Sequence, residues 1–137
     1  MRNVVIDTNC LIQMISLHSP YRPAWQAFRD GRYFLCVSDE ILYEYLEVLG
    51  RLANPFVADN IVNAIKRSPF TKHFDPRFRF MLIEQDEDDN KFTDCAVIAN
   101  ADYIVSEDNH FNVLKRVSFP KLNLLTLDEF LHDLQLL

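Results

Sequence analysis

Residues 4–9 read Val-Val-Ile-Asp-Thr-Asn, and this short stretch sets the expected fold. The β-branched run from Val4 to Ile6 is typical of a buried strand. Asp7-Thr8-Asn9 follows as a polar turn, and the residues from Cys10 to Leu17 then indicate a helix. A strand that passes directly into a helix is the first sign of an alternating α/β chain.

The alternation continues to the end of the sequence. Further strands are expected at Tyr33–Val37, Phe80–Ile83, Tyr103–Ser106 and Leu122–Leu125. Further helices are expected at Ala24–Arg29, from Ser38 to Leu49 or Leu52, from Asn54-Pro55 to before Ser68, at Asn90–Ala101 and at His110–Arg116. A last helix should follow the capping box Thr126-Leu-Asp-Glu129. This order predicts an α/β fold with a mostly parallel sheet covered on both faces. In such sheets, ligands bind at the carboxyl ends of the strands, near the switch in strand order.

Length and composition are those of one globular domain spanning residues 1–137. About half of the 137 residues are apolar, enough for a single core, and no Ser/Gly/Pro-rich linker interrupts them. The apolar run before Asp7 is too short for a signal peptide or a membrane span, so we expect a cytoplasmic protein without membrane contact. Cys10, Cys36 and Cys95 are odd in number and lie in apolar runs, which favours buried thiols over a disulfide or a metal site.

The formal net charge of −6 has the wrong sign for a protein that holds nucleic acid by charge alone. Two interpretations remain. Either the partner is not a nucleic acid, or the acidic residues gather in a site that binds cations.

Two acids follow predicted strands. Asp7 comes after Val4–Ile6, and Asp108 comes after Tyr103–Ser106 in the same strand–acid pattern. Because the carboxyl ends of parallel strands meet at one edge, both acids should face the same rim. For Asp7 alone, a helix N-cap is an equally good explanation.

Two more acids lie on predicted helices. Glu44 sits at the border of an apolar helix face, where a boundary ion pair is an alternative to a site role. Asp94 lies on a helix that is apolar on nearly every side, with Lys91 the nearest cation. A carboxylate in that setting is costly unless it meets a cation or a metal, so a site role is favoured for Asp94.

Carboxylates converging on one rim repel each other and raise each other's pKa values, and a hard divalent cation removes that penalty. Mg²⁺ and Mn²⁺ prefer oxygen ligands, can lower the pKa of water and can offset charge on a phosphodiester. Neighbouring hydroxyls and amides that could support such a site belong to Thr8, Ser106, Asn9 and Asn90. The chain has no G-x-S-x-G, Walker A, H-E-x-x-H or Cys/His metal spacing.

These motifs, in this order, resemble the PIN-domain family. The family pattern is matched by Val5-Ile6-Asp7-Thr8-Asn9, by Glu44 in Ser38–Leu49, by Asp94-Cys-Ala-Val-Ile-Ala-Asn-Ala101, and by Ser106-Glu107-Asp108 followed by Phe111. The match runs from Val4 to about Leu125. Glu107 departs from the small or basic residue usual at its position and adds negative charge near the rim. Asp86–Phe92, followed by Ala101–Ser106, is most similar to the subgroup described as toxins of toxin–antitoxin systems.

The resemblance implies a three-layer α/β/α sandwich and a Mg²⁺- or Mn²⁺-dependent ribonuclease inhibited by a small antitoxin, with a homodimer left open. By position, Asp7, Glu44, Asp94 and Asp108 carry over as catalytic, metal-binding acids, and Asp89 as a fifth acid. The substrate would be single-stranded RNA.

Basic residues in the middle of the chain could attract that RNA. Arg51, Lys72, Arg77 and Arg79 are interleaved with phenylalanines, a pattern suited to charge and stacking contacts, although a solvated surface over core phenylalanines fits as well. Two other functions stay open. A haloacid-dehalogenase-like or receiver-type phosphoryl-transfer protein would use Asp7 as a nucleophile, but the former prefers D-x-D where this chain has Asp7-Thr8-Asn9. A non-catalytic PIN-fold binding module is the other.

Overall fold

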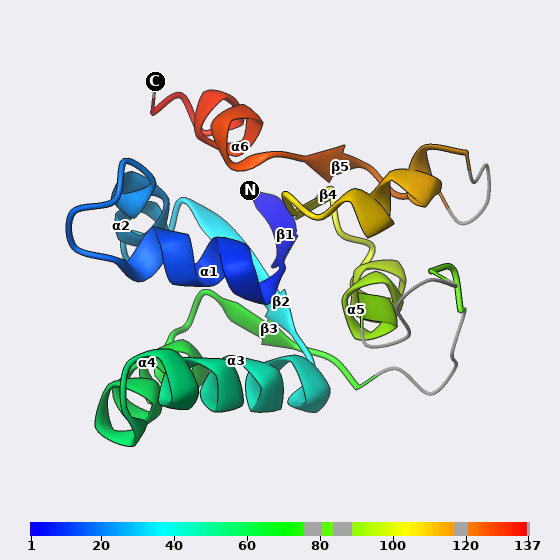
Figure 1. Cartoon of the computed structure of the whole chain (residues 1–137). Coiled ribbons are helices and arrows are strands. Elements are labelled where there is room, and N and C mark those ends of the chain that lie inside the picture. Colours follow the sequence, from blue (N-terminus) through cyan, green and yellow to red (C-terminus); the bar gives the residue numbers. More distant parts are fainter. Residues whose placement is uncertain (76–80, 84–88, 117–120, 137) are drawn as a thin grey trace.

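The computed structural model describes residues 1–75, 81–83, 89–116 and 121–136. Its elements are β1 (Arg2–Ile6), α1 (Thr8–Ile15), α2 (Arg22–Arg29), β2 (Tyr33–Val37), α3 (Asp39–Leu52), α4 (Pro55–Arg67), β3 (Thr71–His73), α5 (Asn90–Ala99), β4 (Tyr103–Val105), the 3₁₀ helix η2 (Asn109–Arg116), β5 (Leu124–Leu125) and α6 (Leu127–Asp133). Strands and helices alternate as the sequence predicts, so the α/β class is confirmed (Figure 1).

The five strands form one all-parallel sheet in the order β3-β2-β1-β4-β5. The chain starts at the centre, builds outward through β2 and β3, and returns to add β4 and β5 on the other side. The strand order therefore switches between β1 and β4, where Val5 pairs with Ile104. The carboxyl ends of these two strands flank the position where parallel α/β sheets bind ligands.

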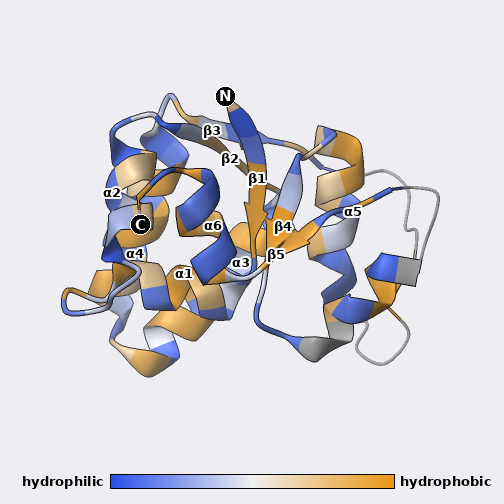
Figure 2. Ribbon diagram, turned by 90° about the horizontal axis from the view of Figure 1, so that it is seen from above, coloured by the Kyte–Doolittle hydropathy of each residue, from blue (hydrophilic) through white to orange (hydrophobic). Residues whose placement is uncertain are grey.

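Helices cover both faces of the sheet. Seen from above, α1, α2, α4 and α6 lie on one side and α5 on the other (Figure 2). The strand residues between them, such as Val4, Val5 and Ile104, are fully buried, as expected for a parallel sheet with two covered faces. Among the described residues, no helix has the length and apolar character needed to span a bilayer.

Local signals explain most boundaries. Ser38, Asn54 and Thr126 each cap a helix with a side-chain oxygen, and Thr126 completes its capping box with Glu129. The helix α5 ends at Ala99, two residues earlier than predicted, and its C-cap residue Asn100 has the left-handed conformation. The three cysteines are buried and free, as expected.

The region after α4 corrects the prediction. The third strand of the chain is β3, not Phe80–Ile83: residues 81–83 are irregular, and Phe80 lies outside the described residues. The side-chain amide of Asn90 accepts from the Ile83 N–H and donates to the Ile83 carbonyl, both at 2.9 Å. This side chain makes the backbone hydrogen bonds that a neighbouring strand would otherwise make. The predicted strand at Leu122–Leu125 is shortened to β5.

One buried hydroxyl fixes α3 against the end of β1. Tyr45 is fully buried and donates to the backbone carbonyl of Ile6, the last residue of β1. Glu44, its neighbour on α3, is thereby held beside the turn that begins at Asp7.

Candidate active site

Asp7 lies where β1 passes into α1, and it caps that helix. Its Oδ1 accepts from the Cys10 N–H at 2.8 Å, so the N-cap interpretation is confirmed. Its Oδ2 accepts from the Ser106 hydroxyl. Only 5% of the residue's surface is exposed. The cap therefore uses one oxygen, and the other is held toward the end of β4.

Burial raises the pKa of the Asp7 carboxyl above its usual value. The hydrogen bonds from Ser106 and Cys10 oppose this shift, and the charge of Asp108 adds to it. The ionised form is thus disfavoured by its surroundings in the protein alone, and a nearby cation would relieve that cost.

Ser106 connects the two strand ends. Besides donating to Asp7, its Oγ accepts from the backbone N–H of Asp108 at 3.0 Å. Asp7 and Asp108 therefore share one hydroxyl at the switch point, on the common rim that the sequence predicts. Glu107 turns elsewhere: its Oε1 accepts from the N–H of Leu127 at 2.8 Å, at the start of α6.

Glu44 joins α3 to both neighbouring helices. Its Oε2 accepts from the Thr8 hydroxyl on α1, and its Oε1 lies 2.8 Å from Nζ of Lys91 on α5. Three helices from different parts of the chain thus meet at one carboxylate. The boundary ion pair considered for Glu44 exists, but its partner is a long-range one.

A hollow of about 230 Å³ opens at this point. Its lining comprises Asp7, Thr8, Asn9, Glu44, Val48, Arg51, Asp89, Phe92 and Asp108. The lining thus includes the carboxylates of Asp7, Glu44, Asp89 and Asp108. It also includes an exposed amide, Asn9, and one guanidinium, Arg51.

Asp94 lies deeper than the lining. It is completely buried on α5, as the apolar character of that helix predicts. Asp94 is three residues after Lys91, so both lie on the same face of the helix. Because Lys91 reaches Glu44, this face of α5 is directed toward Glu44 on α3, and Asp94 itself is not part of the lining.

Other predicted site residues lie elsewhere. The Asn90 amide is engaged on both sides by Ile83 and supports the backbone rather than the hollow. Lys72 is on β3, where Nζ donates to Asn3 and lies 4.1 Å from the centre of the Phe34 ring. Arg77 and Arg79 lie outside the described residues.

Two features were missed by sequence reasoning. Lys91 contacts Glu44, which is 47 positions away, and no local pattern predicts that pair. Asp39, His73 and Asp75 place one ligand atom each within 4.8 Å of one another, and all three are exposed.

The donor set around the hollow suits a hard divalent cation. Every charged ligand there is a carboxylate oxygen, the amide of Asn9 adds a neutral oxygen, and the buried Asp7 carboxyl lacks enough positive charge to offset its burial. Mg²⁺ and Mn²⁺ bind through such oxygens. Soft metals would need thiolates or imidazoles, and none lines this hollow among the described residues.

Comparison with known proteins identifies the family and the fold. A family model described as "PIN domain" matches residues 3–110. The fold is similar to VapBC2 from Rickettsia felis, crystallised bound to a DNA fragment from their promoter, with a TM-score of 0.61, 14% identity, and coverage of 90% of this chain and 98% of that one. It is also similar to VapC20 from Mycobacterium tuberculosis, a sarcin-ricin loop cleaving toxin, with a TM-score of 0.58, 14% identity, and coverage of 80% and 92%. At such identities these structures establish the fold alone. No curated protein sequence matches the chain.

Proposed function

This chain belongs to the PIN-domain family, and on that premise we propose that it is a Mg²⁺- or Mn²⁺-dependent endoribonuclease carried by a single domain over residues 1–137. The observation that carries the proposal is the hollow at the switch point, where Asp7, Glu44, Asp89 and Asp108 line one small space. Asp94 adds a buried carboxylate on the adjoining helix.

Each acid has a distinct task in this proposal. Asp7 and Asp108, linked through Ser106, would hold the cation at the strand ends. Glu44, oriented by Thr8 and Lys91, would face them from α3. When bound, the cation supplies Lewis-acid chemistry, lowering the pKa of water and offsetting charge on the phosphodiester. Arg51, in the same lining, is placed to attract a phosphate.

The geometry disfavours a phosphoryl-transfer protein that uses Asp7 as its nucleophile. This follows from the residue two positions after Asp7. Asn9, where a dehalogenase-like enzyme would have its second acid, lines the hollow but cannot act as a general acid or base.

Cleavage of defined RNAs tests the proposal directly. Purified protein, free of any partner, is incubated with single-stranded and hairpin RNAs of varied sequence in Mg²⁺, in Mn²⁺ and in EDTA. We expect cleavage of single-stranded RNA with a divalent ion and none in EDTA. Asp39→Asn, at an exposed carboxylate outside the hollow lining, is the matched control and should cleave like the wild type. Intact RNA under all conditions would leave the non-catalytic binding module as the better function.

The proposal extends to a toxin paired with a small antitoxin. Its support is the fold shared with VapBC2 and with VapC20, whose descriptions name a two-component complex and a toxin. Expression of the chain alone should arrest bacterial growth, and co-expression with the product of the neighbouring reading frame should restore it and yield a co-purifying complex. If the nuclease is active but growth is unchanged, the enzyme function stands and the toxin role is wrong.

A further inference from the structure

Lys91 places a positive charge next to Glu44, at the border of the acidic hollow. Its Nζ lies 2.8 Å from Oε1 of Glu44, and its side chain is only 11% exposed. The ammonium lies 5.5 Å from the centre of the neighbouring Phe92 ring, and Phe92 itself lines the hollow. A lysine this buried is held by the groups around it and is not a freely moving surface charge.

The ammonium completes the partners of Glu44. Thr8 donates to Oε2 and Lys91 lies on Oε1, so each oxygen of the carboxylate has its own protein contact. Asp7, at the strand ends, accepts hydrogen bonds from neutral donors of the described residues, namely Cys10 and Ser106. Glu44 therefore has a cation in direct contact, whereas Asp7 is contacted by neutral groups, although the Arg51 guanidinium also lines the hollow.

Glu44 lies between two neighbouring hollows and lines both of them. The lining of a second hollow, of about 450 Å³, consists of Asp39, Glu40, Tyr43, Glu44, Glu47 and Lys91. Lys91 lines the second hollow but not the acidic one, so its ammonium contacts Glu44 from the side of the second hollow. A cation that bound Glu44 from that side would have to occupy the position of the ammonium.

We propose that Lys91 is a built-in cation that takes the place of a second divalent ion at Glu44, so that the active site binds a single ion on the Asp7–Asp108 side. Lys91 is then a positioning residue: it neutralises and orients Glu44 without touching the reacting atoms. The inference rests on the proposed metal-dependent function, and it assigns to this site a one-metal composition.

Metal binding without RNA tests this inference. Mn²⁺ is titrated into metal-free wild type, Lys91→Gln and Lys91→Arg, followed by calorimetry and by the electron paramagnetic resonance of free and bound ion. We expect one Mn²⁺ per chain in the wild type and in Lys91→Arg. Lys91→Gln, which loses the charge, should bind a second Mn²⁺ or bind the first at least about tenfold more tightly, because a unit positive charge that would repel the ion is removed.

Spectroscopy separates this effect from a merely structural one. Paired metal ions in two-metal sites lie about 3.5–4 Å apart, so a second Mn²⁺ in Lys91→Gln should give a coupled signal that the wild type lacks. Lys91→Met retains much of the apolar stem without the charge and replaces Lys91→Gln if that variant does not fold. Equal stoichiometry and affinity in the wild type and the neutral variants would overturn the inference, as would two ions in the wild type.

The outcomes distinguish this inference from the proposed function. If the wild type cleaves RNA while the neutral variants bind Mn²⁺ unchanged, only the role of Lys91 fails. If the metal titrations behave as expected but RNA stays intact, the nuclease fails and the fixed cation stands. If neither the wild type nor a neutral variant binds Mn²⁺, both are wrong.

Discussion

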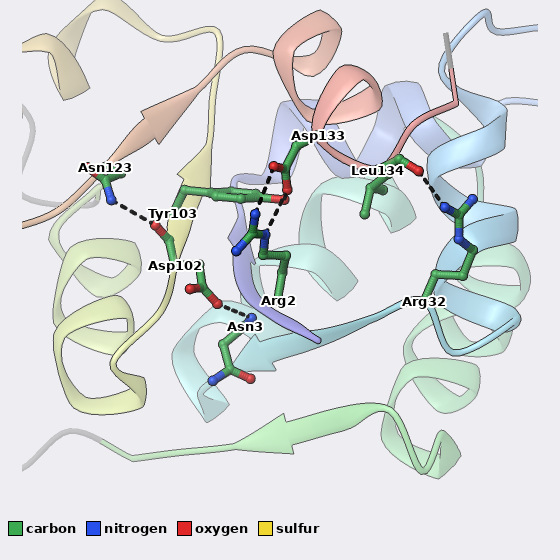
Figure 3. A network of polar contacts seen from close by, with 8 residues as sticks. All are labelled: Arg2, Asn3, Arg32, Asp102, Tyr103, Asn123, Asp133 and Leu134. Carbon is green, nitrogen blue, oxygen red and sulfur yellow. Dashed lines mark hydrogen bonds and ion pairs between the residues drawn. The ribbon is translucent and has the colours of Figure 1, made fainter.

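The two ends of strands β1 and β4 both hold carboxylates, yet their surroundings are opposite in character. At the amino ends, Asp133 of α6 meets the Arg2 guanidinium at 3.1 and 3.3 Å and accepts from the Tyr103 hydroxyl at 2.7 Å (Figure 3). At the carboxyl ends, Asp7 is buried among neutral donors with Asp108 close by. The first is a charge-matched pair, and the second is a gathering of like charges.

The pKa values of the two carboxyl groups are accordingly shifted in opposite directions. The hydrogen bond from Tyr103, with help from Arg2 and against some burial, lowers the pKa of Asp133. Burial raises the pKa of Asp7. A carboxylate that stabilises a fold has its partner within the chain, whereas one that is kept buried at a cost in stability suggests a partner from outside. The larger hollow, of about 500 Å³ and lined by Arg2, Tyr103 and Asp133 among others, lies at the balanced end, so size alone does not locate the site.

The largest expected effect is that of Asp7→Asn. Asparagine is as good an N-cap as aspartate, so α1 should form as before while the charge is lost. RNA cleavage should fall at least about a hundredfold, more than the loss typical for an outer-shell residue. Gel assays with Mn²⁺ measure the cleavage, and circular dichroism checks the fold. An unfolded variant would mean that Asp7 is structural, like Asp133.

Ser106→Ala should have a smaller effect on cleavage. It removes the hydroxyl shared by Asp7 and Asp108 and leaves every carboxylate in place. Loss of such a supporting group typically costs 10- to 100-fold, and we expect about tenfold, with weaker Mn²⁺ binding. Thr126→Ala, which removes a capping hydroxyl of α6, is the matched control. Cleavage as fast as the wild type would mean that Ser106 does not organise the acids.

Variants at the two ends should change the pH dependence of the free energy of unfolding in opposite ways. Urea unfolding in EDTA measures this free energy. The folded pKa of Asp7 lies above the usual 3.8, so its cost is absent below that pH and grows as pH rises through the folded pKa. Asp7→Asn should therefore be more stable than the wild type at pH 7, and equal to it in acid.

For Asp133 the folded pKa lies below 3.8, so its contribution is present above that pH and disappears as pH falls through the folded pKa. Asp133→Asn should lose about 1 kcal/mol at pH 7, the low end for a charged hydrogen bond because the pair is partly exposed. Its deficit should vanish in acid, and its RNA cleavage should be unchanged. Variants that shift in the same direction with pH would remove the contrast between the two ends.

The smallest expected effect is that of Tyr103→Phe. The ring remains packed edge-on against Phe130, and only the hydroxyl that donates to Asp133 is lost. A loss of about 0.5 kcal/mol in the free energy of unfolding, the low end for one hydrogen bond, is expected, with the pKa of Asp133 moving back toward its usual value. Carboxyl NMR titration measures that pKa. An unchanged value would mean that Arg2 alone controls this acid.

Local patterns predicted the parts of this fold that depend on neighbours in sequence. The strand Tyr33–Val37, the helix starts at Ser38 and Asn54 and the capping box at Thr126 appear as expected, because apolar runs and capping oxygens act over a few residues. The strand β3 was missed because its three residues, Thr-Lys-His, carry no apolar signal at the sheet edge. Its place was given to Phe80–Ile83, an apolar stretch whose residue Ile83 pairs with the Asn90 side chain.

The residues of the site likewise divide into those that local sequence patterns predict and those that they do not. Asp7 and Asp108 could be placed on one rim because each follows a strand, and the burial of Asp94 could be inferred from its apolar helix. The Lys91–Glu44 pair and the role of Asn90 could not, since both are contacts that exist only after the chain has folded. The predicted roles of Asp89 and Arg51 gain support from their place in the lining, whereas that of Lys72 does not.

The central position of β1 has a consequence for the making of the protein. The strand synthesised first pairs on one side with β4, and Asp7 meets Ser106 across 99 positions of chain. At a translation rate of about 5–20 residues per second, several seconds separate the synthesis of these two residues. During that interval the nascent chain carries its first acid but not its partner strand. The site therefore cannot assemble until β4 has left the ribosome.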